Sequence, residues 1–390
     1  MTNEQTVAEN PEKRKRGTGT GGNFFVLDKS QWEKIWDNKT TTRNRLNLAV
    51  AYLVMMAGTG ADHSFTKWSA AAIRRYTAMN MDSGNAAIQE LIARKLAKYA
   101  PSSTRPRPHY LMATAIKPDE AAVIFLPVAL VTGLGATDTS MLHRIRETGD
   151  ALLLRLLIDL YGQVTTDAPF ALGLGTIRTY WDKTDPAEKA REIGAHTIWH
   201  LAECNVKTMG NLDQSRYTVK GEEKNTIFWN KLKLLETVGA IYYESWLFNG
   251  GEIDADPLFP MTKHDNVADW ADTAARRLLT GPEDERHWLS EQYPNRLVAL
   301  PTHHQKPALQ LVAKMMIEAD TPGRRGAFGE RSRIMAHWLE QYGRLLQEAE
   351  AGRYDNPVRT QVKEAVGNDR TYQGNQGNQG HQGSSKVSNL

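Results

Sequence analysis

The chain has 390 residues, of which 41% are hydrophobic and 24% charged, as in ordinary globular proteins. This length predicts about two or three domains, each large enough to bury its own core. The single cysteine, Cys204, excludes an intrachain disulfide and a cysteine-based zinc site, which favours a reducing, cytoplasmic compartment. No apolar stretch reaches the roughly 18–20 residues of a membrane span, so we expect no membrane association.

The positive charge is concentrated in one segment. Lys39 to Lys117 holds twelve Lys and Arg residues against three acids (Asp62, Asp82 and Glu90), a net charge of +9. The whole chain carries only +3, so the remainder sums to −6. A compact basic unit on a slightly acidic body is the charge pattern typical of nucleic-acid-binding proteins.

Both ends of the chain are predicted to be disordered. Residues 1–23 form a basic arm that combines the run Lys13–Arg16 with several glycines. Residues 353–390 form a tail that becomes rich in Gly, Gln and Asn, with almost no apolar residue to build a core. The glycine-rich run of the arm follows no predicted strand, which favours a linker over a phosphate-binding loop.

Residues 24–117 are predicted to form the first domain. An apolar helix over Thr41–Met56 is followed by helices over Lys67–Tyr76 and Ser83–Arg94. Two short strands, Leu96–Tyr99 and His109–Thr114, then flank a loop rich in proline and arginine.

The third helix of this domain carries the residues predicted to read DNA bases. Asp82 or Ser83 is expected to cap it, and Ile88, Leu91 and Ile92 to face the core. Asparagine and glutamine can form paired hydrogen bonds with adenine, and small side chains allow close approach to the major groove. The predicted base-reading residues on the outer face are Ser83, Asn85, Ala86 and Gln89.

Basic residues around that helix are predicted to contact phosphates. The loop Pro101–Pro108 is expected to form a wing in which prolines hold Arg105 and Arg107 extended, suited to phosphates or an adjacent minor groove. The full predicted set is Arg43, Arg45, Arg74, Arg75, Lys95, Lys98, Arg105 and Arg107.

This segment resembles the winged helix-turn-helix superfamily of DNA-binding proteins. The resemblance covers about 50 residues and departs from the common pattern at Asn80–Met81, where a glycine is frequent, and in the short spacing from Ser83 to Leu96. The residues that carry it are Ile73, Ser83, Ile88, Leu91 and Leu96, with the wing closing at Tyr110 and Leu111.

A second winged helix is predicted within residues 118–262. The spacing of leucines predicts a helix over 140–162, and a helix over 229–238 leads into an aromatic strand over 240–248. Residues 263–352 are predicted to form a helical C-terminal region. The expected fold is therefore mainly α with small β-hairpin wings, an α+β arrangement of tandem winged helices, whose layout resembles that of plasmid replication initiators.

The predicted function is binding of double-stranded DNA, in replication initiation of plasmid or phage type or in transcription regulation. The protein is expected to be no enzyme and to use no cofactor, because no nucleotide-binding or nucleophile motif occurs. His303 and His304 are adjacent with no acidic partner spaced nearby, so no metal site is expected either. Self-association or a replication or transcription protein is a possible further interaction. The alternative is a protein–protein interaction module built on winged helices, without DNA binding.

Overall fold

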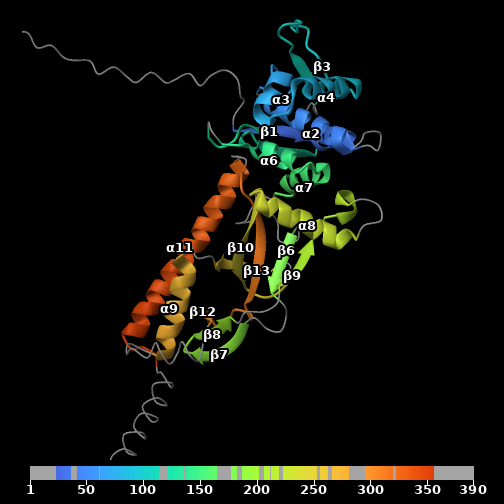
Figure 1. Cartoon of the computed structure of the whole chain (residues 1–390). Helices are drawn as coiled ribbons and strands as arrows, with labels where there is room; N and C mark the ends of the chain where they lie inside the picture. Colours follow the sequence, from blue (N-terminus) through green and yellow to red (C-terminus); the bar gives the residue numbers. More distant parts are fainter. Residues whose placement is uncertain are drawn as a thin grey trace, which may run out of the picture. The chain divides into compact units, whose positions relative to one another are not determined.

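The structure is a computed structural model, shown in Figure 1, which divides the chain into two compact units. Unit 1 comprises residues 1–176, 211–243 and 313–330, and unit 2 comprises residues 177–210, 244–312 and 331–390. The domains predicted from sequence were consecutive segments, whereas these units interleave along the chain. The residues described are 23–36, 42–60, 62–113, 122–135, 138–164, 177–181, 187–201, 206–210, 212–218, 223–252, 255–261, 266–280, 295–318 and 322–354.

Unit 1 begins with a two-stranded antiparallel sheet and short helices. β1 (Phe24–Asp28) pairs with β5 (Val123–Pro127), so the chain returns to its starting strand after the basic segment. The helices around this sheet are α1 (Lys29–Glu33), η1 (Lys34–Trp36) and α5 (Ala129–Thr132). The predicted basic arm up to residue 22 and the predicted tail from residue 355 lie outside the described residues.

Residues 42–112 form a module of three helices and three strands, which we call the helix–sheet unit. Its elements are α2 (Thr42–Ala57), β2 (Phe65–Thr66), α3 (Ala70–Thr77), α4 (Met81–Ala93), β3 (Ala97–Tyr99) and β4 (Tyr110–Met112). β4 is the central strand of an antiparallel sheet with the order β2-β4-β3. α2 supplies much of the core, because every side chain from Leu48 to Ala57 is buried. The three predicted helices are confirmed, and β2 is a strand that the sequence analysis missed.

The rest of unit 1 is largely helical. α6 (Met141–Glu147) and α7 (Ala151–Tyr161) replace the single helix predicted over 140–162. The chain breaks between them because Gly149 adopts a φ of +71° and the Asp150 carboxylate caps α7, accepting hydrogen bonds from the backbone N–H of Leu152 and Leu153. η2 (Gln214–Tyr217) and α8 (Lys224–Thr237) complete this part.

Unit 2 contains most of the β-structure. A five-stranded sheet has the order β11 (Pro257–Pro260), β10 (Ile241–Phe248), β13 (Ala308–Met315), β6 (Ile177–Trp181) and β9 (Val206–Gly210). A three-stranded sheet has the order β12 (Arg296–Pro301), β8 (His196–Leu201) and β7 (Ala187–Ile193). The boundary between the units falls within β10 and within β13, so each of these strands contributes residues to both.

Two helices complete unit 2. α9 (Asn266–Thr280) and α11 (Pro322–Glu350) lie side by side in Figure 1, and most of α11 belongs to this unit. Phe259 packs between Trp338 and Tyr342, with ring centroids 5.2 and 5.8 Å away. The buried Tyr342 hydroxyl donates a hydrogen bond to the backbone carbonyl of Ala299 at 3.1 Å, which ties α11 to β12.

The predicted mainly α fold with tandem winged helices is wrong. The protein is mixed α+β, with 49% helix, 23% strand and four sheets among its described residues. The predicted wing strand, β10, instead lies between β11 and β13 in the five-stranded sheet. The predicted helical region 263–352 contains β12 and β13, which pair with strands far earlier in the chain, as in the pairing of Gln310 with Tyr180 and of Arg296 with Leu201. Pairing between such distant segments leaves no local pattern in the sequence.

Candidate nucleic-acid interface

The candidate interface is centred on α4, which begins earlier than predicted. The Asn80 side chain caps the helix, and its Oδ1 accepts a hydrogen bond from the backbone N–H of Ser83 at 2.7 Å. The prediction that Asp82 or Ser83 is the cap is therefore wrong, since both lie inside the first turn. An asparagine cap satisfies a backbone donor that would otherwise lack a partner at the helix start.

Packing of α4 against its neighbours determines which of its faces is exposed. Ile88 and Leu91 are buried, and an added Cβ on Gly84 would lie 3.4 Å from the Ala70 Cβ, so α3 and α4 approach closely there. The outer face then presents Asn85, Ala86 and Gln89, all exposed, while Ser83 is half-buried. Exposed Met81 and Asp82 extend this face toward the helix N-terminus, and neither is among the base-reading residues predicted from the sequence.

Gln89 is linked to the neighbouring sheet. Its side-chain amide nitrogen donates a hydrogen bond to the Tyr99 hydroxyl at 3.0 Å. The Tyr99 ring packs beside that of Tyr110 with centroids 5.4 Å apart, yet Tyr99 remains 50% exposed. This exposed aromatic residue on β3 adjoins the predicted base-reading surface and was missed by the sequence analysis.

The C-terminal end of α4 places a lysine in an unfavourable backbone conformation. Leu96 N–H donates to the Leu91 carbonyl at 2.9 Å and Lys95 N–H to the Ile92 carbonyl at 3.0 Å, as in a Schellman motif. Lys95 has a φ of +61°, a position that glycine usually occupies because a Cβ there costs about 1 kcal/mol. An exposed cation therefore occupies a position where its side chain lowers the stability of the fold.

The loop between β3 and β4 projects beyond α3 and α4 in Figure 1. Thr104 and Arg107 exchange two backbone hydrogen bonds, of 3.2 and 3.1 Å, which close a turn with Arg105 and Pro106 at its tip. The prediction that Arg105 is held extended is therefore wrong: it lies in a tight turn. The backbone N–H of His109 also donates to the Ser103 hydroxyl at 3.1 Å, and both loop arginines are exposed.

The remaining predicted cations fall into two groups. Arg74 and Arg75 are exposed in the last turn of α3, and Lys98 is exposed on β3 beside Tyr99. Arg45 lies elsewhere: it is half-buried on α2 and lines a separate pocket, so it is not included in the interface proposed below. The side chain of Arg43 lies outside the described residues.

Acidic residues also lie on α4. The Glu90 carboxylate accepts a hydrogen bond from the Arg94 Nε at 2.7 Å, so its charge is compensated within the helix. Asp82 is exposed in the first turn, where a carboxylate interacts favourably with the helix dipole. Among the exposed charged side chains of the unit, cations outnumber the acids Asp62, Asp82 and Glu90.

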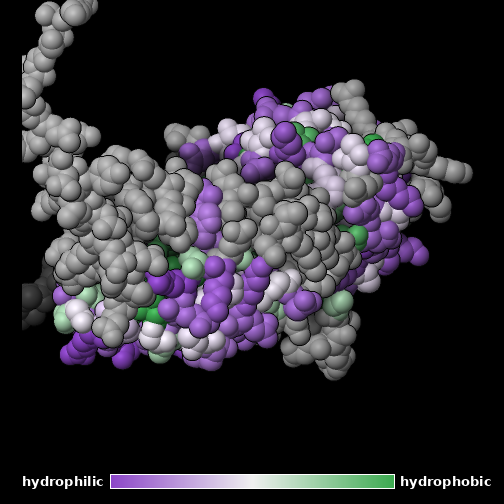
Figure 2. Space-filling view, turned by 90° about the horizontal axis from the view of Figure 1, so that it is seen from below, coloured by the Kyte–Doolittle hydropathy of each residue, from purple (hydrophilic) through white to green (hydrophobic). Residues whose placement is uncertain are grey.

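Two further features were sought in the described part of the chain, a metal site and a membrane-spanning helix. Its His, Cys, Asp and Glu residues form no group placed to hold a metal ion. None of its helices is both long and apolar enough to cross a membrane. The described surface in Figure 2 is mainly hydrophilic on the face shown, with hydrophobic residues in small separate areas. Comparisons with protein-family models, curated proteins and solved structures found no match to the chain.

Proposed function

We propose that the helix–sheet unit is a winged helix that binds double-stranded DNA, with α4 in the major groove and the β3–β4 loop on the adjacent backbone. One observation carries this proposal. The elements of the unit follow the order helix, strand, helix, helix, strand, strand, with β4 as the central strand. This arrangement places an exposed face of α4, which carries amide side chains, and an arginine-tipped loop in one basic module. Winged helices present a recognition helix and a wing to DNA in this arrangement.

Base reading is assigned to the exposed face of α4. The Asn85 and Gln89 amides suit adenine, and Ala86 allows close approach or contact with a thymine methyl group. The Asp82 carboxylate can accept a hydrogen bond from the amino group of cytosine. The Gln89 amide nitrogen carries two hydrogens, so while one is donated to Tyr99 the other remains available, with the amide oxygen, for a paired contact with adenine.

Affinity is assigned to six exposed cations. Each neutralised phosphate releases counterions, so six contacts predict that log K falls with log salt with a slope of about −5. These residues are Arg74, Arg75, Lys95, Lys98, Arg105 and Arg107. In the cell such a non-enzymatic protein would act in replication initiation, of plasmid or phage type, or in transcription regulation.

A second candidate function is binding of another protein through the same face. Met81 and Tyr99 are 36% and 50% exposed beside the α4 amides, and exposed Met and Tyr are enriched at protein interfaces. This candidate predicts a partner that remains bound after nuclease treatment, with weak dependence on salt.

The test is a salt series of duplex binding by the full chain, measured by fluorescence anisotropy. We expect the double variant Arg105→Ala/Arg107→Ala to remain fully folded and to make the slope of log K against log salt shallower by about two. The matched control is Arg344→Ala/Arg353→Ala, which removes the same charge from two exposed arginines of unit 2 and should leave the slope unchanged. Absent or salt-independent duplex binding would reject the proposal.

A further inference from the structure

A second cluster of cations lines a cavity in unit 1, outside the interface described above. Its volume is about 690 Å³, and its walls come from α2, the turn between α6 and α7, α7, α8 and the short helices η1 and η2. We call it the arginine pocket. The charged residues in its lining are Arg45, Arg155, Arg216 and Lys231, with Asp150 as the one acid.

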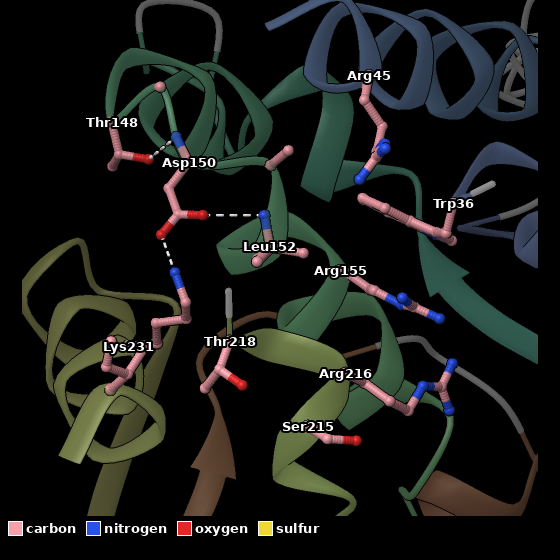
Figure 3. Close-up of a pocket in the computed structure, with 13 residues that line it drawn as sticks. Trp36, Arg45, Thr148, Asp150, Leu152, Arg155, Ser215, Arg216, Thr218 and Lys231 are labelled. Carbon is pink, nitrogen blue, oxygen red and sulfur yellow. Dashed lines mark hydrogen bonds and ion pairs between the residues drawn. The ribbon is translucent and has the colours of Figure 1, made fainter. Parts of the chain in front are cut away.

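Acidic residues hold two of the arginines at one side of the pocket. Arg155 Nη2 lies 2.7 Å from Glu33 Oε2, and Arg216 pairs with the same carboxylate. Arg216 Nη2 is also 3.4 Å from Asp159 Oδ2, which accepts a hydrogen bond from the Tyr217 hydroxyl at 2.9 Å. Figure 3 shows the two guanidinium groups turned to the same side of the pocket, with Arg45 above them.

The opposite side is formed by α7 and α8. Lys231 forms an ion pair with Asp150, whose other oxygen caps α7 (Figure 3). The lining also includes Leu152 and Ile227, both half-buried, and the hydroxyl-bearing Ser215 and Thr218. The pocket therefore combines cationic groups with apolar and hydroxyl-bearing side chains.

Carboxylates pair with three of the cations in the pocket lining, Arg155, Arg216 and Lys231, so an anionic ligand has to displace one of these carboxylates. Burial lowers the pKa of Arg155, and the neighbouring Arg216 lowers it further, although the carboxylates of Glu33 and Asp159 oppose this. Of the two carboxylates that pair with the guanidinium groups, Glu33 is 47% exposed, whereas Asp159 is only 10% exposed. A dianion entering the pocket can replace Glu33 at Arg216, which is itself 36% exposed and keeps Asp159 as a partner.

We propose that the arginine pocket binds a phosphorylated small molecule of about nucleotide size. Guanidinium groups match phosphate oxygens in geometry and charge. The volume of 690 Å³ lies within the roughly 300–1,000 Å³ of small-molecule sites and far exceeds the needs of inorganic phosphate. Leu152 and Ile227 provide the apolar wall that the uncharged part of such a ligand needs. The phosphate binds at Arg216 and Arg45, and Lys231 contacts the end of the ligand that lies away from them.

The proposal is tested by isothermal titration calorimetry of the full chain with ATP and, separately, with inorganic pyrophosphate. We expect saturable binding of ATP and weaker binding of pyrophosphate, which lacks the apolar part. Arg216→Gln and Lys231→Gln should each raise the ATP dissociation constant about tenfold, as expected for a lost charge-assisted hydrogen bond. Lys233→Gln removes an exposed lysine from the same helix and should leave the constant unchanged.

Three results would overturn the proposal. The first is no saturable ATP binding up to about 1 mM. The second is equal weakening by Lys233→Gln. The third is a result showing that the pocket binds the phosphates of DNA. In that case Arg216→Gln would weaken duplex binding as much as Arg105→Ala/Arg107→Ala does. Unfolding curves show whether each variant is folded, and because Arg216 and Lys231 lie on separate helices, either variant alone supplies the test.

Discussion

The Gln89 side chain donates a hydrogen bond to the hydroxyl of Tyr99 at 3.0 Å, which connects the outer face of α4 to the edge strand β3. The bond holds in place the amide that we assign to base reading. It uses one of the two hydrogens on the amide nitrogen and leaves the other, with the amide oxygen, for a paired contact with adenine. The hydrogen bond therefore orients the amide and is compatible with DNA binding.

Tyr99→Phe removes only the hydroxyl and tests whether this hydrogen bond orients Gln89 for base reading. We expect the variant to bind a selected duplex site a few-fold more weakly than the wild type, because the amide is no longer held in place, whereas Gln89→Ala binds it about tenfold more weakly. Stability should change by less than about 1 kcal/mol, because the bond is exposed. The measurement is anisotropy on duplexes selected from a random pool. Unchanged binding by Tyr99→Phe would show that the hydrogen bond does not position the Gln89 amide for DNA.

Lys95→Gly is expected to have opposite effects on stability and on DNA binding. Glycine removes the cost of a side chain at a φ of +61°, so the free energy of unfolding should rise by about 0.5–1 kcal/mol. The lost phosphate contact should weaken duplex binding at low salt and make the salt slope shallower by about one. Lys95→Ala is the matched control, since it removes the charge and keeps the Cβ: we expect the same loss of binding with no gain in stability. Unchanged duplex binding in both variants would remove Lys95 from the interface.

The part of the fold predicted from the sequence is the part determined by local patterns. α3 and α4 follow from the spacing of Ile73, Ile88 and Leu91, and the strands β3 and β4 follow from their short apolar runs beside prolines. β2 was missed because it has only two residues, Phe65 and Thr66, and exists through pairing with a strand about 45 residues later. Two residues are too few to show the alternation of apolar and polar side chains by which a strand is predicted from a sequence.

The charged residues show a similar limit. Exposure of Arg105 and Arg107 could be predicted because a loop between prolines lies at the surface. Arg45 could not be assigned, since α2 is buried over most of its length and only the tertiary packing directs this side chain toward Arg155 and Arg216. The arginine pocket is composed of segments more than a hundred residues apart, so no sequence motif marks it.

Arg331→Met should strongly destabilise unit 2. The Glu244 carboxylate accepts hydrogen bonds from both Arg331 terminal nitrogens, at 2.7 and 2.6 Å, and a third from Trp246 Nε1 at 2.8 Å. The side chains of Glu244 and Arg331 are only 7% and 14% exposed. Removing one partner of a buried pair leaves a buried charge uncompensated, at a cost of about 3–5 kcal/mol.

Urea denaturation measures this effect, and α11 offers a control on the same helix. Arg344 pairs with Glu340 at 3.3 Å, with side chains 59% and 69% exposed. Arg344→Met removes the same charge from an exposed pair and should cost less than about 1 kcal/mol. Similar losses in the two variants would mean that the Glu244–Arg331 pair contributes no more than a surface ion pair.

Acidification should destabilise unit 2 partly through His196. Burial lowers the pKa of this side chain below its ordinary value of 6.5, although the Glu348 carboxylate on α11 opposes the shift. Its ring Nδ1 is buried with no hydrogen-bond partner among the described residues, and its ring packs edge-on against Tyr354 at 6.3 Å. The folded state therefore disfavours the protonated form.

The sign of the pH dependence follows from this lowered pKa. Above pH 6.5 the imidazole is neutral in both the folded and the unfolded chain, so it contributes no pH dependence. Below pH 6.5 the unfolded chain takes up the proton first, and the free energy of unfolding therefore falls until the pH passes the pKa of the folded state. His196→Gln removes this component, and the loss of unfolding free energy between pH 7 and about pH 5 should be smaller than in the wild type. His337→Gln, at an exposed position on α11, should keep the wild-type loss. If the His196→Gln variant lost as much unfolding free energy as the wild type, the folded chain would accommodate the charged imidazole at no cost.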